Sequence, residues 1–237
     1  INHCPSQNGL INPVAAIGHA LEREQSNAWY LVDACQSVGQ MPIDVTEIGA
    51  DFLSVTGRKF VRGPRGTGFM YCSSRSLAEL EPFPADLYGA HWDPDGYTMR
   101  SNAQRFESWE KDYAALLGLG AAVDYSLALG LDAIGQRITY LAKEMRRMLD
   151  EIPGIEVLDR GVEKSGIITF RHERVDSAAI VAGLKELGIS VSLGTPEYSQ
   201  VDYLAHGVTS MVRVSPHIYN TLEELERCAE VVRGLSS

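Results

Sequence analysis

The sequence predicts an α/β fold with a mainly parallel, doubly wound sheet, followed by a smaller α+β domain. Buried-strand patterns alternate with helical patterns through residues 28–72, and one of these strands ends abruptly in a carboxylate, Asp33. The helix-breaking pair Pro153-Gly154, with further strand patterns after it, predicts the change to the second part. We therefore expect residues 1–105 to belong to the large domain, 106–152 to form connecting helices and 153–237 to form the small domain.

Composition and charge exclude several classes of protein. The chain has 237 residues, is 45% hydrophobic and carries 31 acidic against 21 basic side chains. This acidic balance, without a basic stripe, argues against a nucleic-acid partner. No apolar run of 18 residues and no signal-peptide pattern are visible, so we expect no membrane partner. The four cysteines are scattered without metal spacing, which favours reduced thiols in the cytoplasm and no metal site.

The elements of the first half follow from capping residues and apolar runs. Asn12 is a suitable N-cap and Pro13 suits the first turn of the helix that follows. Asp44 is expected to cap a shorter helix. Strands are expected at residues 28–33, 51–56 and 67–72. Residues 73–105 are expected to be rich in loops.

The second half reads as helices followed by short strands. Helices are expected at residues 110–129 and 131–152, and the methionines of the second of them are expected in the core. Strands are expected at residues 156–158, 166–170, 189–192 and 210–215. Asp176 is expected to cap one helix, and Thr221 with Glu224 forms a capping box that opens the last one.

The stretch from Ser54 to Tyr71 concentrates cations and glycines between two strands. Four cations lie within eight residues of an acidic chain, at Arg58, Lys59, Arg62 and Arg65. Glycines let backbone N–H groups approach an anion closely, so the stretch predicts an anion site, with a solvated loop as the alternative. The glycines lead into a strand and not into a helix, which argues against a dinucleotide site. A lysine held here would form a Schiff base if its pKa were lowered.

Three motifs together resemble one family. Asp33-Ala-Cys-Gln36, Thr56-Gly-Arg-Lys59 and Gly63-Pro-Arg-Gly66 look like the class V aminotransferases, the pyridoxal-phosphate group that contains cysteine desulfurases, isopenicillin N epimerase-like proteins and the C–S lyases of ergothioneine biosynthesis. The resemblance covers nearly the whole chain and implies the PLP-dependent transferase fold of type I. The Gly-rich phosphate loop and the ring-stacking residue that precede these motifs in the family are missing from this sequence, so the chain looks like a part that lacks the N-terminal region.

The resemblance assigns a role to each motif residue. It makes Lys59 the catalytic Schiff-base lysine of pyridoxal 5'-phosphate and pairs Asp33 with the pyridine nitrogen. Gln36 would approach the ring hydroxyl. Thr56 and Arg58 would hold the phosphate, with Arg58 standing where the family usually has histidine.

Three further residues are assigned outside these motifs. Ser6 falls where the desulfurases carry an asparagine near the ring, so it is expected to contact the cofactor. Arg213 resembles the family arginine that grips the substrate carboxylate, and His91 belongs to an aromatic loop that could line the substrate pocket or simply pack onto the body. The Arg-Phe-Glu segment at 105–107 also resembles the family, but Trp109-Glu110 replaces the Gly-Thr pair that reaches the phosphate of a second subunit.

The expected reaction type rests on one observation, which is the absence of a cysteine where the desulfurases carry their catalytic one. Residues 194–200, where desulfurases carry the persulfide-forming cysteine, contain none. We therefore expect an enzyme that acts at Cα or Cβ of an amino acid in the manner of a C–S lyase, as a homodimer. An aminotransferase and an epimerase stay open as alternatives. So does a non-catalytic fragment or one subunit of a split enzyme.

Overall fold

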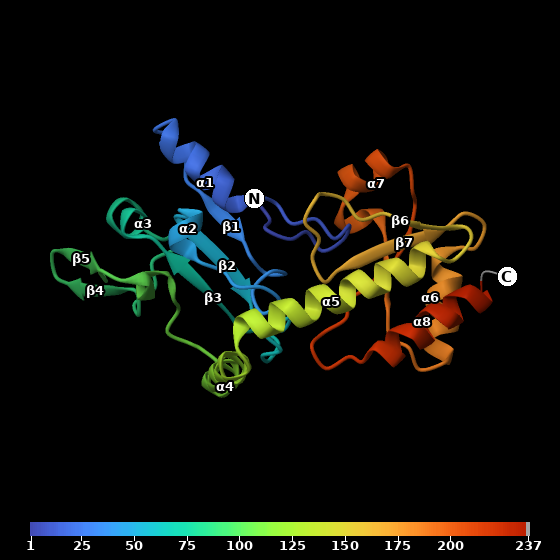
Figure 1. The fold of residues 1–237 in the computed structure, drawn as a ribbon. Helices are drawn as coiled ribbons and strands as arrows, with labels where there is room; N and C mark the ends of the chain where they lie inside the picture. The colour runs from blue at the N-terminus through green and yellow to red at the C-terminus, as the bar shows by residue number, and fades with distance from the viewer. Residues whose placement is uncertain (236–237) are drawn as a thin grey trace. The chain divides into compact units, whose positions relative to one another are not determined.

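The computed structural model describes residues 1–235, which divide into two compact units (Figure 1). The first unit contains residues 1–3, 13–38 and 43–128, and the second contains residues 4–12, 39–42 and the chain from Leu129 onward. The units are interleaved in sequence because two short segments of the first half pack with the second unit. The expected division at residues 105 and 152 stays a prediction.

The sheet of the first unit has the strand order β1-β2-β3 (Figure 1). Its strands are β1 Leu31–Asp33, β2 Phe52–Thr56 and β3 Gly68–Cys72. Strand β1 runs parallel to β2, whereas β3 is antiparallel to β2. Asn2 forms a further parallel bridge with Asp33, so the segment Ile1–His3 extends the sheet beyond β1. The predicted α/β fold with a mainly parallel sheet is confirmed.

The helices of the first unit agree in part with the expected ones. They are α1 Val14–Arg23, α2 Val45–Ile48, α3 Ser74–Glu79 and α4 Tyr113–Leu129. The side chain of Asp44 caps α2 as predicted, by accepting hydrogen bonds from the backbone of Thr46 and Glu47. The predicted N-cap Asn12 is wrong, because α1 begins one residue later and Pro13 takes the cap position without a side-chain hydrogen bond.

The stretch expected to be rich in loops contains regular structure. A hairpin pairs β4 Ala90–Asp93 with β5 Gly96–Met99, and a short 3-10 helix follows at Ala103–Phe106 (Figure 1). The Pro94-Asp95 turn and Gly96, with φ of 152°, close the hairpin. The turn formers that favoured a loop are therefore the turn of a hairpin.

The core of the first unit lies between its sheet and α1, α2 and α4. Its buried members include Val14, Val32, Leu53, Val55 and Leu119. A Cβ on Gly18 would lie 1.8 Å from the Ile48 carbonyl oxygen, so α1 and α2 approach each other only because glycine has no side chain.

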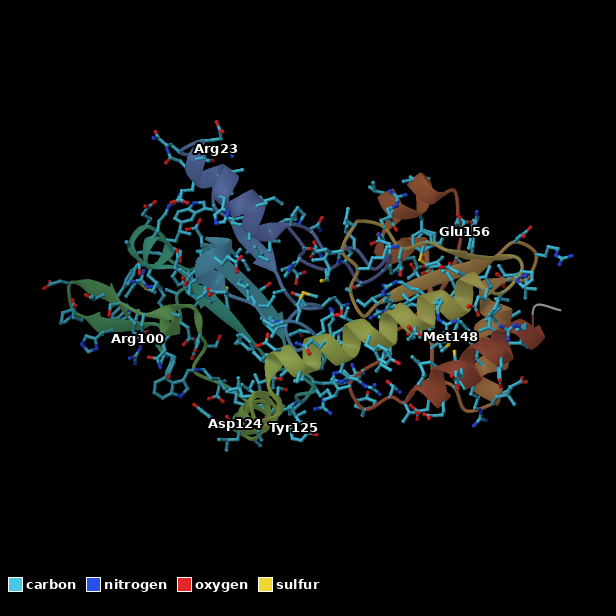
Figure 2. The ribbon with its side chains drawn as sticks, in the orientation of Figure 1. Arg23, Arg100, Asp124, Tyr125, Met148 and Glu156 are labelled. Atoms are coloured by element: carbon cyan, nitrogen blue, oxygen red, sulfur yellow. The ribbon has the colours of Figure 1, made fainter. Side chains whose placement is uncertain are left out.

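The second unit is built on an antiparallel sheet with the order β6-β7-β9-β8, of which Figure 1 labels β6 and β7. Its strands are β6 Ile155–Val157, β7 Ile168–His172, β8 Ser192–Gly194 and β9 Met211–Val214, and its helices are α5 Leu131–Asp150, α6 Ser177–Glu186, α7 Gln200–His206 and α8 Leu222–Leu235. Side chains of α5, α6 and α8 share one core with β7 and β9. Met148, labelled in Figure 2, lies in this core together with Met145, as predicted.

Several boundaries of the second unit differ from the expected ones. The strand expected at residues 189–192 is wrong, because Ile189 and Val191 pack against the core while the ladder with β9 begins at Ser192. Helix α7 was not expected. Asp176 takes the N-cap position of α6 but makes no capping hydrogen bond. The capping box of α8 is confirmed, since Thr221 Oγ1 accepts from Glu224 N and Glu224 Oε2 accepts from Thr221 N.

Among residues 1–235, no single helix is both long and apolar enough to cross a bilayer, whereas α4 and α5 taken together have sufficient length and apolar composition. Among the same residues no three His, Cys, Asp or Glu side chains are grouped so as to hold a metal ion.

Candidate functional site

Two of the predicted cofactor-binding residues, Asp33 and Thr56, lie where two parallel strands end. Asp33 is the last residue of β1 and lies opposite Ser54 of β2, which itself ends at Thr56. The pairing continues one residue further, because Ala34 N donates to Ser54 O at 2.9 Å. Parallel strands bring their carboxyl ends to one edge of a sheet, which is where α/β proteins place ligand groups.

Asp33 is held on both sides by the sheet. Its backbone N–H donates to Ile1 O and its carbonyl accepts from His3 N, both at 2.9 Å. The half-buried carboxylate accepts from Cys35 N at Oδ1, at 2.9 Å, and from the Asn2 side-chain amide at Oδ2, at 3.4 Å. The orientation of this carboxylate is therefore set by the turn that follows β1 and by the neighbouring segment.

The lysine turn, residues 57–67, is closed by its own backbone. Gly57 N donates to Thr67 O at 2.8 Å, and Gly63 N donates to Gly57 O at 2.7 Å. Inside the turn, Arg62 N donates to Lys59 O at 2.9 Å. Phe60 is buried beside half-buried Lys59. The backbone of the turn is thus held by its own hydrogen bonds, whereas Arg58, Arg62 and Arg65 are exposed, and both the anion site and the solvated-loop alternative stay predictions.

Two glycines allow the lysine turn to pack against α4. A Cβ on Gly57 would lie 2.3 Å from Thr67 Oγ1 and 2.9 Å from Leu119 Cδ1. A Cβ on Gly63 would lie 2.8 Å from the same leucine atom. These glycines are therefore required for close packing, in addition to any role in admitting an anion.

The other residues of the first unit that are expected to bind the cofactor lie at the end of β2 or in the segments that directly follow β1 and β2. Gln36 is buried in the turn after β1, where Ser37 N and Val38 N both donate to Ala34 O. Thr56 is half-buried at the end of β2, and Arg58 is exposed next to Lys59. Asp33, Gln36, Thr56, Arg58 and Lys59 therefore come from two adjacent strand ends.

Cys35 is a neighbour of these groups that the sequence analysis did not assign. Its Sγ lies 3.9 Å from Ser54 O. Burial and a hydrogen bond to Asp33 raise the pKa of the Cys35 thiol, against a smaller opposite effect of Lys59. The charges of Asp33 and Lys59 therefore both act on the Cys35 thiol. The signal in the sequence was the position of Cys35 two residues after the carboxylate.

His91 lies apart from these elements in the fold. It is exposed on β4, opposite Thr98 of β5. Its assignment to a substrate pocket stays a prediction.

Ser6 and Arg213 belong to the second unit. Ser6 is exposed in the segment of residues 4–12, which is fastened to this unit by backbone hydrogen bonds from Arg160 N to Asn8 O and from Ser165 N to Gly9 O. Arg213 lies in β9 between Ser192 of β8 and Thr169 of β7. Its half-buried guanidinium donates to Ser215 Oγ at 3.1 Å, and burial lowers its pKa.

The donor set of the first unit fits pyridoxal phosphate in chemical terms. Asp33 provides a carboxylate for a protonated ring nitrogen, and Lys59 provides an amine for an aldehyde. Thr56 and Arg58, a hydroxyl and a cation, are groups that bind phosphate.

Comparison with known proteins places the chain in a family. The family model described as aminotransferase class-V matches residues 1–228. A probable cysteine desulfurase of Methanothermobacter thermautotrophicus is 34% identical over 241 residues, which is all of this chain and 60% of that protein. A cysteine desulfurase of Salmonella newport is 31% identical over 239 residues, again all of this chain and 57% of the relative. The chain thus spans about 60% of the length of these relatives.

Solved structures agree with the sequence comparison. The apo cysteine desulfurase of Thermococcus onnurineus has a TM-score of 0.91 at 27% identity, and the match covers 99% of this chain and 58% of that chain. The cystine C–S lyase C-DES, in complex with cysteine persulfide, has a TM-score of 0.82 at 25% identity, with 98% and 59% covered. The protein belongs to the class V aminotransferase family and has the PLP-dependent transferase fold of type I.

Proposed function

We propose that the protein is a pyridoxal-phosphate-dependent enzyme that acts through Lys59 on an amino acid and cleaves a C–S bond without forming a persulfide on cysteine. The observation that carries the proposal is the grouping of Asp33, Cys35 and Lys59 at two parallel strand ends in a chain of the class V family. A carboxylate and a lysine are the two groups that this cofactor requires of its protein.

The residues of the lysine turn and of β1 would hold the cofactor. When bound, pyridoxal phosphate supplies an electron sink for charge that develops at Cα of an amino acid. Asp33 would keep the ring nitrogen protonated and Gln36 would bind the ring hydroxyl. Thr56 and Arg58 would bind the phosphate. Lys59 would hold the cofactor and then accept the Cα proton as a general base.

Arg213 would bind the carboxylate of the substrate. Arg213 lies on β9, an interior strand of its sheet, opposite the neutral residues Thr169 of β7 and Ser192 of β8. None of the ion pairs found among residues 1–235 includes Arg213. A half-buried cation that no carboxylate accompanies favours an anionic ligand.

The cysteines support C–S cleavage without a persulfide. The segment 194–200 contains no cysteine. Cys228 lies in the core of the second unit, where burial raises the pKa of its thiol to about 11. A buried, protonated thiol is a poor nucleophile.

The similarity to C-DES, which is named a cystine C–S lyase, supports the choice of reaction. We also propose that the enzyme works as a homodimer in the cytoplasm and that its substrate is an amino acid with sulfur attached to Cβ.

Labelling tests the cofactor assignment. The protein is incubated with pyridoxal phosphate, reduced with borohydride and mapped by peptide mass spectrometry. We expect a pyridoxyl group on Lys59 and none in Lys59→Ala. Lys185, which lies at the last turn of α6 in the second unit, serves as the matched lysine that stays unmodified. A folded protein with Lys59 unmodified would contradict the proposal.

Product analysis tests the reaction. With cystine or a cysteine conjugate we expect ammonia, pyruvate and the released sulfur fragment, which is a thiol from a conjugate and free cysteine persulfide from cystine. We expect Cys228→Ser to retain this activity. Transfer of the amino group to a keto acid would instead indicate an aminotransferase. A persulfide found on Cys228 would contradict the proposed route.

A further inference from the structure

Helix α7 and the segment of residues 4–12 meet at Gly194, the last residue of β8. A Cβ on Gly194 would lie 2.5 Å from the hydroxyl oxygen of Tyr203 in α7 and 3.0 Å from Nε2 of Gln7 in the segment. The two polar groups therefore reach the same place only because residue 194 has no side chain. All three residues belong to the second unit.

Both polar side chains at this junction are buried, with Tyr203 1% and Gln7 6% exposed. Among the described residues, the Tyr203 hydroxyl and Gln7 Oε1 make no hydrogen bond of normal length. Burial raises the pKa of the Tyr203 hydroxyl to about 12, against a smaller opposite effect of the Gln7 amide, so the hydroxyl keeps its proton at neutral pH. The hydroxyl thus has a proton to donate, and the adjacent amide has an oxygen to accept it.

A second connection between α7 and the segment runs through Arg160. Its guanidinium Nε lies 3.8 Å from Oδ1 of Asp202, the residue before Tyr203. Its backbone N–H donates at 2.8 Å to the carbonyl of Asn8, the residue after Gln7. Two consecutive residues of α7 are therefore connected to two consecutive residues of the segment.

The segment carries Ser6, an exposed residue that directly precedes Gln7 and that the sequence analysis assigns to the cofactor. We propose that Tyr203 is a positioning residue, which forms a hydrogen bond with Gln7 beside Gly194 and so lets α7 fix the position of Ser6. Two buried polar groups with no other partner gain free energy by pairing, because each costs about 1–3 kcal/mol when it is left unpaired. The effect on the cofactor rests on the proposed function, whereas the coupling of α7 to the segment does not.

The thiol of Cys4 reports on this coupling, since it lies in the same segment. Cys4 is 1% exposed, so its alkylation requires the segment to open. Cys228 is 3% exposed in the core of the second unit and is alkylated only when that core opens. The two alkylation rates, measured on protein without cofactor, therefore separate opening of the segment from unfolding of the unit.

In Tyr203→Phe we expect Cys4 to be alkylated about fivefold faster, with an unchanged rate at Cys228, because the variant keeps the ring and loses only the hydrogen bond. An unchanged or slower reaction of Cys4 would overturn the proposal. Equal acceleration at Cys4 and Cys228 would also overturn it, because Tyr203 would then stabilise the unit as a whole.

Two further variants sharpen this measurement. Gly194→Ala places a methyl group between Tyr203 and Gln7, so Cys4 should again react about fivefold faster or more. Tyr140→Phe is the matched control, because Tyr140 is exposed on α5 of the same unit, and it should leave the rate at Cys4 unchanged. A normal rate in Gly194→Ala, or an equal effect of Tyr140→Phe, would contradict the proposed pairing.

The absorption spectrum of the bound cofactor tests whether the coupling extends to Ser6. Ser6→Ala and Tyr203→Phe should shift the spectrum in the same direction, and the double variant should shift it no further than Ser6→Ala, because Tyr203 acts through Ser6. Additive shifts, or no shift in Tyr203→Phe, would overturn the role assigned to Tyr203. If Lys59 is not labelled by pyridoxal phosphate, the proposed function fails, and the alkylation of Cys4 still decides whether α7 holds the segment.

Discussion

The sheets of the two units differ in how much of their apolar surface the described residues bury. In the second unit, Leu141, Phe170, Ile180 and Val212 are fully buried, in a core that includes α5, α6 and α8. In the first unit, three consecutive large apolar side chains of β3 remain exposed, with Phe69 at 44%, Met70 at 39% and Tyr71 at 36%.

Helix α4 of the first unit also leaves apolar side chains exposed. It is apolar on all sides, yet Leu119 and Ser126 are its only buried residues within the described chain. Tyr125, labelled in Figure 2, is 53% exposed and stacks under the guanidinium of Arg62. A helix without a polar face is normally buried. The second unit therefore completes a core with its own residues, whereas the first unit, which holds the lysine turn, does not cover its apolar strand and helix.

The largest expected loss of stability comes from replacing a buried phenylalanine. Because each sheet contains a phenylalanine, the same substitution in both sheets compares the buried sheet with the exposed one. Phe170→Ala should lower the free energy of unfolding by about 3–5 kcal/mol, because a fully buried ring leaves a cavity. Phe69→Ala should lower it by about 1 kcal/mol or less, since its ring is already in contact with solvent. Urea unfolding followed by circular dichroism measures both. Equal losses would mean that β3 is as well packed as β7.

The next expected loss of stability concerns a buried ion pair in the second unit. Arg146 Nε lies 2.7 Å from Asp159 Oδ2, with the two side chains 12% and 0% exposed. Arg146 also donates to the carbonyls of Ser165 and Ile167. Arg146→Ala should cost about 3–5 kcal/mol in the same unfolding experiment, because it leaves a buried charge without its partner.

The neighbouring Arg147 is the matched control for Arg146. It forms ion pairs with Glu144 and Glu151 on the exposed side of the same helix. Water screens such pairs, so Arg147→Ala should leave the unfolding midpoint nearly unchanged. Similar losses in the two variants would show that burial of the ion pair is unimportant.

Gly57 tests how tightly the lysine turn is packed within the less covered unit. In Gly57→Ala the new methyl group meets Thr67 and Leu119, so we expect a loss of about 1–3 kcal/mol and reduced labelling of Lys59. Gly120→Ala in α4 has open space around it and should instead stabilise the protein by up to about 1 kcal/mol. A Gly57→Ala protein with normal stability and labelling would mean that the turn adapts easily.

The smallest expected loss of stability comes from removing a helix N-cap, and each unit offers one N-cap residue for comparison. Asp44→Ala removes the side chain that accepts from Thr46 N and Glu47 N, and should cost about 1 kcal/mol. Asp176→Ala removes an N-cap residue that makes no capping hydrogen bond, and should cost only a few tenths of this in urea unfolding. The reverse order would contradict the assigned caps.

The parts that could be predicted are those with a strong local signal. Alternating strand and helix patterns were sufficient for the α/β fold, and the capping residues of α2 and α8 were sufficient to begin those helices. The motifs around Asp33 and Lys59 were sufficient for the family. The roles assigned to all of the site residues, those of Lys59 and Asp33 included, remain predictions.

The hairpin β4–β5 and helix α7 were missed for a physical reason. The residues of the hairpin are turn formers and exposed polar or aromatic groups, which have weak preferences of their own. Helix α7 has only seven residues, which is too short a stretch to show a helical period in the sequence. The strand β8 was misplaced because pairing with β9, and not local propensity, decides where the ladder begins.

The sequence by itself determined the family, the α/β alternation and the residue types available for chemistry, since these depend on composition and short-range pattern. Only the tertiary structure decided that Asp33 lies opposite Ser54 of β2, that segment 4–12 packs with the second unit, and that β3 stays exposed. These features arise from contacts between residues far apart in the chain or from the burial of one element by another. Such contacts are set by packing of the whole unit, which no local window of sequence contains.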